Sequence, residues 1–204
     1  MVVTEIQELS KSRSKIVLDQ EFAFVLYKGE FRQYGIKLGQ ELSEETYREI
    51  MTEVLPKRAK LRAMNLLKSR SYTTSQLRMK LQQGGYPETV IEEALAYVAS
   101  FHYTDDLRYA VDFITDNEQR KSRFRIELDL RAKGLSPEII EQAWWEWQDN
   151  GGLQNETAMI EALLKKRNYD PERADIKEKQ KTYAFLMRKG FSGENISRAM
   201  REDF

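Results

Sequence analysis

Side chains that could carry acid–base or metal chemistry are scarce in this chain. His102 is the only histidine and there is no cysteine, so a histidine triad, a multi-histidine metal site and a cysteine nucleophile cannot be built within it. Asp105 and Asp106 are adjacent carboxylates, but neighbours on a helix point in different directions, and both suit the positive end of a helix dipole. We therefore expect no catalytic residue and no metal site, and we interpret His102 as a structural or surface residue.

Nucleotide chemistry has no support in the glycine pattern. No glycine-rich stretch ends in Gly-Lys-Ser or Gly-Lys-Thr, and no Gly-x-Gly-x-x-Gly follows a strand-like run. Trp144, Trp145 and Trp147 could stack on bases or grip a partner, but tryptophans at helical spacing more often belong to a core. The sequence predicts a protein without cofactor or enzymatic activity, one that acts by binding.

Charged residues are arranged in blocks, although 33 basic and 33 acidic residues leave no net charge. Between Val54 and Pro87 every charged residue is basic: Lys57, Arg58, Lys60, Arg62, Lys68, Arg70, Arg78 and Lys80. In residues 88–118, all the charged side chains are acidic except that of Arg108. Further basic residues follow, namely Arg120, Lys121, Arg123, Arg125, Lys165, Lys166, Arg167, Lys177, Lys179 and Lys181. Such blocks are typical of docking on a large, electrostatically patterned partner, and helices paired through complementary faces are the alternative.

A motif that occurs three times indicates which elements position these blocks. Residues 81–86, 130–135 and 186–191 each begin with leucine and end in a glycine followed by a bulky apolar residue. The glycines are Gly85, Gly134 and Gly190, followed at +6 by Ile91, Ile140 and Ile196 and at +9 by Ala94, Ala143 and Ala199. A glycine in the left-handed conformation can end one helix, and the apolar residue after it can hold the start of the next. The isoleucines and alanines should then face the core.

Each copy of the motif has a further helical stretch upstream, at residues 57–69, 105–116 and 156–167. Three helices per copy give three repeats, which we expect at residues 55–104, 105–152 and 153–204. In the first stretch the apolar stripe is Ala59, Ala63, Leu66 and Leu67, which leaves Lys57, Lys60 and Lys68 on a different face. The fold class predicted is mainly α.

The first 54 residues have another pattern. β-rich runs at residues 15–18 and 22–27, separated by Asp19-Gln20, predict a strand or hairpin unit. Ser43 can cap a helix that runs to about Val54, where Pro56 is expected to interrupt the chain. We predict a small β-containing N-terminal extension followed by one helix.

The chain should work in a reducing compartment, since it has no cysteine from which a disulfide could form. Its first residues lack a basic region followed by an apolar stretch, and no run approaches the roughly 18 apolar residues of a membrane span. We expect a cytoplasmic monomer without a membrane partner.

The repeats resemble the RecX family, bacterial regulators of the RecA recombinase. The residues that carry this resemblance are Ala63-Met64-Asn65-Leu66-Leu67-Lys68-Ser69-Arg70, Tyr103-Thr104-Asp105-Asp106-Leu107-Arg108-Tyr109-Ala110, Lys121-Ser122-Arg123-Phe124-Arg125-Ile126-Glu127-Leu128 and Phe185-Leu186-Met187-Arg188-Lys189-Gly190-Phe191-Ser192. The likeness runs from about Pro56 to the C-terminus. Gln76, where an acidic residue is common, and Ser122-Arg123, where a glycine is common, depart from the family pattern.

The resemblance implies an elongated, curved array of three-helix repeats that lies in the groove of the RecA filament on single-stranded DNA. There it would restrain ATP turnover and strand exchange during homologous recombination, DNA repair and the SOS response. The basic residues would then be contacts to the partner or to DNA. The alternative is a protein that binds DNA directly through its basic helices, although its acidic blocks would repel the same phosphate backbone.

Overall fold

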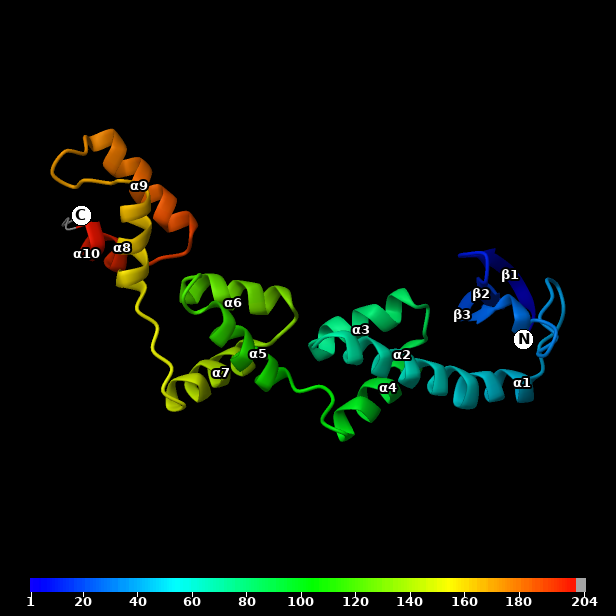
Figure 1. Cartoon of the computed structure of the whole chain (residues 1–204). Helices are drawn as coiled ribbons and strands as arrows, with labels where there is room; N and C mark the ends of the chain where they lie inside the picture. Colours follow the sequence, from blue (N-terminus) through cyan, green and yellow to red (C-terminus); the bar gives the residue numbers. More distant parts are fainter. Residues whose placement is uncertain (201–204) are drawn as a thin grey trace. The chain divides into compact units, whose positions relative to one another are not determined.

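A computed structural model describes residues 1–200, and the chain forms two compact units, Met1–Asp105 and a second that begins at Asp106. The first unit holds a three-stranded sheet and one three-helix repeat, and the second holds two more repeats (Figure 1). The prediction of a mainly α fold with tandem three-helix repeats and a small N-terminal sheet is confirmed. No helix within residues 1–200 is long and apolar enough to cross a membrane.

The antiparallel sheet has the order β1-β2-β3, with β1 at Val3–Glu8, β2 at Arg13–Leu18 and β3 at Glu21–Tyr27. Asp19 and Gln20 join β2 to β3 with φ of 49° and 71°, the left-handed conformation that matches the twist of a two-residue hairpin. The sequence predicted β2 and β3 but missed β1, because most of its side chains are polar and exposed. One face of the sheet belongs to the core of the first unit through Ile16, Phe24 and Leu26.

A long helix connects the sheet to the first repeat. It comprises α1 (Glu44–Glu49), the π-helical segment η2 (Ile50–Val54) and α2 (Leu55–Ser69) without a break. The predicted interruption at Pro56 is therefore wrong. Pro56 has no N–H to donate, and the wide turn before it, in which the Leu55 N–H donates to the Ile50 carbonyl, accommodates the proline inside the helix.

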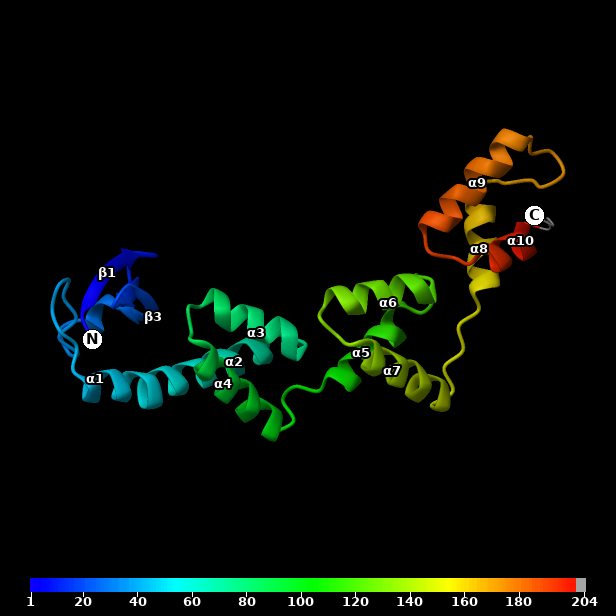
Figure 2. The same ribbon diagram turned by 180° about the vertical axis from the view of Figure 1, so that it is seen from behind.

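The three repeats share one arrangement. Repeat 1 is α2, α3 (Thr74–Gln83) and α4 (Glu88–Ser100); repeat 2 is α5 (Asp106–Asn117), α6 (Arg123–Ala132) and α7 (Pro137–Asp149); repeat 3 is α8 (Glu156–Lys166), α9 (Ile176–Arg188) and α10 (Gly193–Met200). In each repeat the first and third helices pack along one another and the second lies against this pair, as both views show (Figure 1, Figure 2).

The glycine motif ends the second helix of every repeat. Gly85, Gly134 and Gly190 follow α3, α6 and α9 with φ of 80°, 84° and 87°, so their prediction as helix ends is confirmed. The isoleucines of the motif are buried, as are Ala94 and Ala143. Ala199 differs, since it is only partly buried at the edge of its core, where Met200 takes the interior position.

Two of the glycine corners, at Gly85 and Gly190, lie against the module before them. A Cβ on Gly85 would come within 2.2 Å of the Val25 Cγ2 of β3. One on Gly190 would come within 2.7 Å of the Ser122 Oγ at the start of α6. Only a residue without a side chain fits at these two joints, so the same glycines that end helices also allow neighbouring modules to touch.

Candidate nucleic-acid interface

Half of the basic residues of the repeat 1 block pair with carboxylates within the first unit. Arg78 on α3 donates to the carboxylates of Glu88 and Glu92, both on α4. The hydrogen bond between Arg78 and Glu92 raises the pKa of the guanidinium and lowers the pKa of this carboxylate. Arg78 is thus a cation held inside the repeat.

Lys57 and Lys60 also have acidic partners. The Lys57 ammonium lies 2.9 Å from Glu53 one turn earlier, and that of Lys60 lies 2.6 Å from Glu93 on α4 and 5.2 Å from the Tyr97 ring centre. Glu53 precedes Lys57 by one turn of the same continuous helix, whereas Glu93 lies on another helix of the repeat. The Lys60–Glu93 pair is of the kind expected where helices pair through complementary faces.

Arg58 holds the sheet to α2. Its guanidinium pairs with Glu30 and lies over the Tyr27 ring, 4.7 Å from the centre. It also donates to the Val25 carbonyl at 3.5 Å. These contacts give Arg58 a structural role at the joint between the sheet and the long helix.

Four of the eight cations of the block have no acidic partner among residues 1–200. Arg62 and Lys68 are exposed, and neither has an ion pair in the described part of the chain. Arg70 lies over the Tyr72 ring at 4.4 Å, and Lys80 bonds a neighbouring side-chain amide. The positive charge that repeat 1 offers to a partner is therefore about half of what its sequence indicates.

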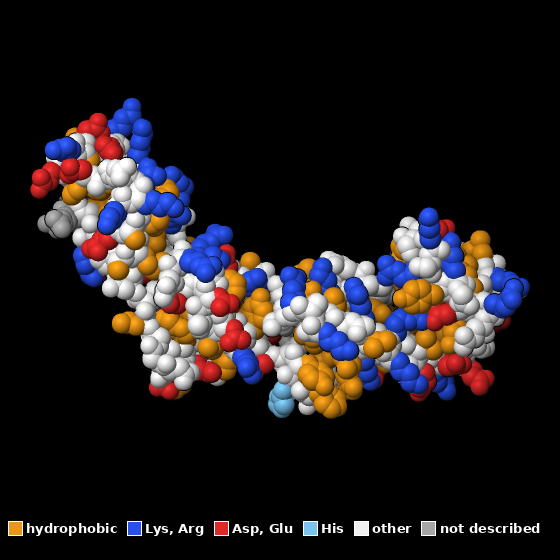
Figure 3. Space-filling model, in the orientation of Figure 1, with side chains coloured by type: hydrophobic (Ala, Val, Ile, Leu, Met, Phe, Trp, Pro, Cys, Tyr) orange, Lys and Arg blue, Asp and Glu red, His pale blue; other side chains and the backbone are white. Residues whose placement is uncertain are grey.

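Hydrophobic side chains gather beside the single histidine (Figure 3). Phe101 and Tyr103, the residues on either side of His102, are 54% and 52% exposed, and their rings stack with centres 5.7 Å apart. His102 is exposed and has a φ of 54° at the end of α4. Its interpretation as a surface residue is confirmed.

The tryptophans divide between core and surface. Trp144 and Trp147 are 2% and 7% exposed and meet edge to face at 5.4 Å, whereas Trp145 is 67% exposed. The guanidinium of Arg123 lies 4.8 Å from the centre of the Trp144 ring. A cavity of about 680 Å³ lined by Trp144, Trp147 and Phe124 adjoins this cluster. The prediction of core tryptophans is thus confirmed for two of the three.

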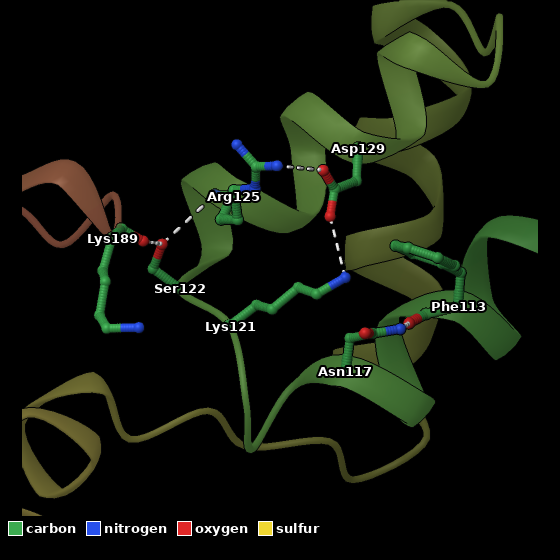
Figure 4. Close-up of polar contacts among 7 residues, drawn as sticks. All are labelled: Phe113, Asn117, Lys121, Ser122, Arg125, Asp129 and Lys189. Atoms are coloured by element: carbon green, nitrogen blue, oxygen red, sulfur yellow. Dashed lines mark hydrogen bonds and ion pairs between the residues drawn. The ribbon is translucent and has the colours of Figure 1, made fainter. Parts of the chain in front are cut away.

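The basic residues of repeat 2 share two carboxylates. Lys121 and Arg125 both bind Asp129, at 2.9 Å and 3.2 Å, as Figure 4 shows. Arg123 binds Glu127 at 2.9 Å. The remaining member of the predicted set, Arg120, has no ion pair among the described residues.

In repeat 3, Lys165 and Lys166 are exposed and have no acidic partner within residues 1–200. Arg167 lies over the Phe185 ring at 4.4 Å. Lys177 and Lys181 line a hollow of about 340 Å³ that also contains Asp175 and Glu178.

The structure brings part of the predicted basic set together with residues that the sequence did not single out. A cavity of about 540 Å³, here called the basic cavity, lies between repeats 2 and 3 in the second unit. Its cations are Arg120, Lys121, Arg125, Lys166, Arg188 and Lys189. Arg188 and Lys189 come directly before Gly190, where the chain turns back after α9. Their position next to this motif glycine was the one signal in the sequence that could have pointed to them. Figure 3 shows Lys and Arg side chains over this part of the unit.

The comparisons with known proteins agree over most of the chain. Family models match for "RecX, first three-helix domain" at residues 59–97, "RecX, second three-helix domain" at residues 105–143 and "RecX, third three-helix domain" at residues 154–200. The regulatory protein RecX of Caldanaerobacter subterraneus subsp. tengcongensis is 30% identical over 202 residues, which is 98% of each chain. That of Clostridium acetobutylicum is 27% identical over 98% of this chain and 94% of its own.

Solved structures show the same fold. A crystal structure of regulatory protein RecX aligns with a TM-score of 0.64 and 24% identity, covering 98% of this chain and 99% of that one. RecX from Lactobacillus salivarius aligns with a TM-score of 0.60 and 21% identity over 72% of this chain and 96% of its own. From the three domain matches and the full-length relatives together, we conclude that the chain belongs to the RecX family of regulatory proteins.

Proposed function

We propose that this protein is a negative modulator of the RecA recombinase. It binds along the groove of the RecA filament on single-stranded DNA and restrains ATP hydrolysis and strand exchange. It acts in the cytoplasm as a monomer, without a cofactor and without catalysing a reaction itself. The observation that carries the proposal is the presence of all three RecX three-helix domains, in order, between residues 59 and 200.

The charge distribution supports docking by many modest contacts. The cations that remain without acidic partners are spread over the repeats, with Arg62 and Lys68 in the first and Lys165 in the third. In a complex that engages both units, the free energy of binding would be shared among many modest contacts.

The test is inhibition of DNA-dependent ATP hydrolysis by purified recombinase. We expect the chain to inhibit, and we expect the R62E/K68E/K165E variant to inhibit several-fold less at low salt. The difference should shrink as salt rises, because screening removes the same interaction from the unmodified protein. No inhibition by the folded, unmodified chain would refute the proposal.

A matched control separates docking from net charge. Lys11, Arg32 and Lys37 are exposed cations of the N-terminal region without an acidic partner in residues 1–200. The variant K11E/R32E/K37E carries the same change in charge outside the repeats and should inhibit like the unmodified chain. Equal loss in both variants would argue against docking through the repeats.

Direct DNA binding is the second candidate function, and the basic cavity is the observation that favours it. A direct DNA binder would bind an oligonucleotide as tightly without recombinase as with it. A regulator of the filament would bind much more tightly when recombinase coats the DNA. Fluorescence anisotropy with a labelled oligonucleotide, with and without recombinase, distinguishes the two functions.

A further inference from the structure

The basic cavity collects cations from three separate segments of the second unit. Arg120, Lys121 and Arg125 come from the α5–α6 loop and the first turn of α6, Lys166 ends α8, and the pair 188–189 ends α9. No Asp or Glu is among the residues that line it. Six like charges around about 540 Å³ create a positive potential that favours an anion.

Internal pairing removes only a small part of this charge. Within residues 1–200, Asp129 is the single carboxylate that binds cations of the cavity, through Lys121 and Arg125. Arg120, Lys166 and Arg188 have no hydrogen-bonded or ionic side-chain partner among the described residues. The Lys189 ammonium has only a ring contact, 5.2 Å from the Phe185 ring centre. Four of the six cations therefore lack an acidic partner among the described residues, and a bound anion would relieve their mutual repulsion.

The segments that form the cavity are held in place by buried and directional bonds. The Ser122 hydroxyl, in a residue that is 0% exposed, donates to the Lys189 carbonyl at 2.9 Å (Figure 4). The Gln154 amide donates to the carbonyls of Glu118 and Lys121 at 2.7 Å and 2.8 Å. The Glu156 carboxylate accepts from the Arg123 N–H at 2.7 Å. The cations thus surround a cavity whose walls are tied together, a preorganised arrangement that lowers the cost of binding.

The chemistry of the walls indicates the class of ligand. Guanidinium and ammonium groups together are the usual partners of phosphate oxygens, with arginine able to bind two of them at once. Met159, Leu163 and Phe191 add an apolar surface next to the cations, and such a surface can cover a sugar or a base but gives no advantage to a small hydrated ion. A volume of about 540 Å³ is within the range of small-molecule sites.

We propose that the basic cavity between repeats 2 and 3 is a binding site for phosphate groups. The phosphate can belong to the backbone of single-stranded DNA or to a free polyphosphate such as a nucleotide. The inference stands on the cavity itself and does not rest on the proposed action on RecA. A ligand bound there would contact α6, α8 and α9 at once and would strengthen the joint between the two repeats.

The test uses the full chain and no recombinase. Pyrophosphate and ATP are titrated by calorimetry, and a fluorescent oligo-dT by anisotropy, with the unmodified chain and with the variant R120Q/K166Q/R188Q. This variant removes three of the four cations that lack an acidic partner, and it keeps Asp129 and Ser122 with their partners. The control is K11Q/R32Q/K37Q, which loses the same charge in the first unit, and melting curves verify that both variants fold.

For whichever probe binds in the cavity, we expect the affinity of the cavity variant to fall at least about tenfold. The affinity of the control should fall less than about twofold. For oligo-dT, the slope of log affinity against log salt should fall by about 2, since each contact to a single strand contributes about 0.7.

Selective loss for the oligonucleotide alone identifies a phosphodiester ligand, and selective loss for pyrophosphate or ATP identifies a free polyphosphate. Equal losses in the cavity variant and the control, or no binding of any probe at low salt, would overturn the inference. Because recombinase is absent, this result and the ATP-hydrolysis result can fail independently.

Discussion

The hydroxyl of Ser122 donates a hydrogen bond of 2.9 Å to the carbonyl oxygen of Lys189, 67 residues later in the chain. The same hydroxyl accepts from the Arg125 N–H at 3.3 Å and so caps the start of α6. A single buried side chain therefore begins the second helix of repeat 2 and joins it to the end of the second helix of repeat 3.

Replacing Ser122 with alanine should destabilise the second unit by about 2 kcal/mol, because it removes both a helix cap and the hydrogen bond to the Lys189 carbonyl. Ser136 is a suitable control, since its side chain caps α7 through the Ile139 N–H and no bond from it to another repeat is recorded. S136A should cost about 1 kcal/mol. Urea unfolding measures both, and equal costs would show that the bond between repeats contributes nothing.

Gly190→Ala should cost clearly more than Gly151→Ala. Both glycines have a φ of 87°, which costs any other residue about 1 kcal/mol. A Cβ at position 151 meets nothing within 4 Å, whereas one at position 190 comes within 2.7 Å of the Ser122 Oγ. We therefore expect G190A to cost at least about 2 kcal/mol in unfolding experiments. Similar values for the two variants would contradict the tight joint.

Arg78→Met should raise the pKa of Glu92, because the hydrogen bond from Arg78 is the largest cause of its lowered value. A carboxylate with a lowered pKa in the folded state contributes stability above its unfolded pKa, and this contribution is lost as the pH falls through the folded pKa. The difference in stability between the unmodified chain and R78M should accordingly shrink in acid.

Carboxyl NMR titration measures this shift directly. Glu138 provides the internal control, since its pKa is lowered by hydrogen bonds at the start of α7 that do not involve Arg78. An unchanged Glu92 titration in the folded R78M variant would show that the ion pair does not form in solution.

His102→Gly should stabilise the first unit by about 0.5–1 kcal/mol, because His102 has a φ of 54° in a conformation that glycine adopts without strain. The flexibility that glycine adds to the unfolded chain offsets part of the gain. Asn168, with a φ of 55° after α8, is the comparison: asparagine tolerates this conformation better, so N168G should gain less. Thermal melts decide, and destabilisation by H102G would refute the argument.

The sequence predicted what depends on local chemistry. Gly85, Gly134 and Gly190 end helices because a chain reversal after a helix favours glycine, and this preference is visible in the motif itself. Pro56 was predicted to interrupt the helix, but the wide π-helical turn before it allows the helix to continue through the proline. None of the residues of that turn is of a type that indicates a π-helix in the sequence.

Features that depend on contacts between distant segments were not predictable in this way. Lys60 looked unpaired because Glu93 lies two helices further along the repeat, on α4. The basic cavity was missed for the same reason, since Arg120, Lys166 and Arg188 lie on different elements and become neighbours only in the folded unit. Charge in the sequence of a repeat protein indicates which residues are basic, but the packing of helices decides which remain available.

The glycine corners also bear on how the protein is made. Gly85 docks on Val25, and Gly190 docks on Ser122, so in both joints the receiving surface is synthesised before the corner that fits it. In a nascent chain the receiving surface is therefore available first, and the third helix that follows each corner, α4 or α10, completes the repeat that docks on it. Domains generally fold in this N-to-C order during synthesis. The two joints fit this order, because each corner docks on a residue that lies earlier in the chain.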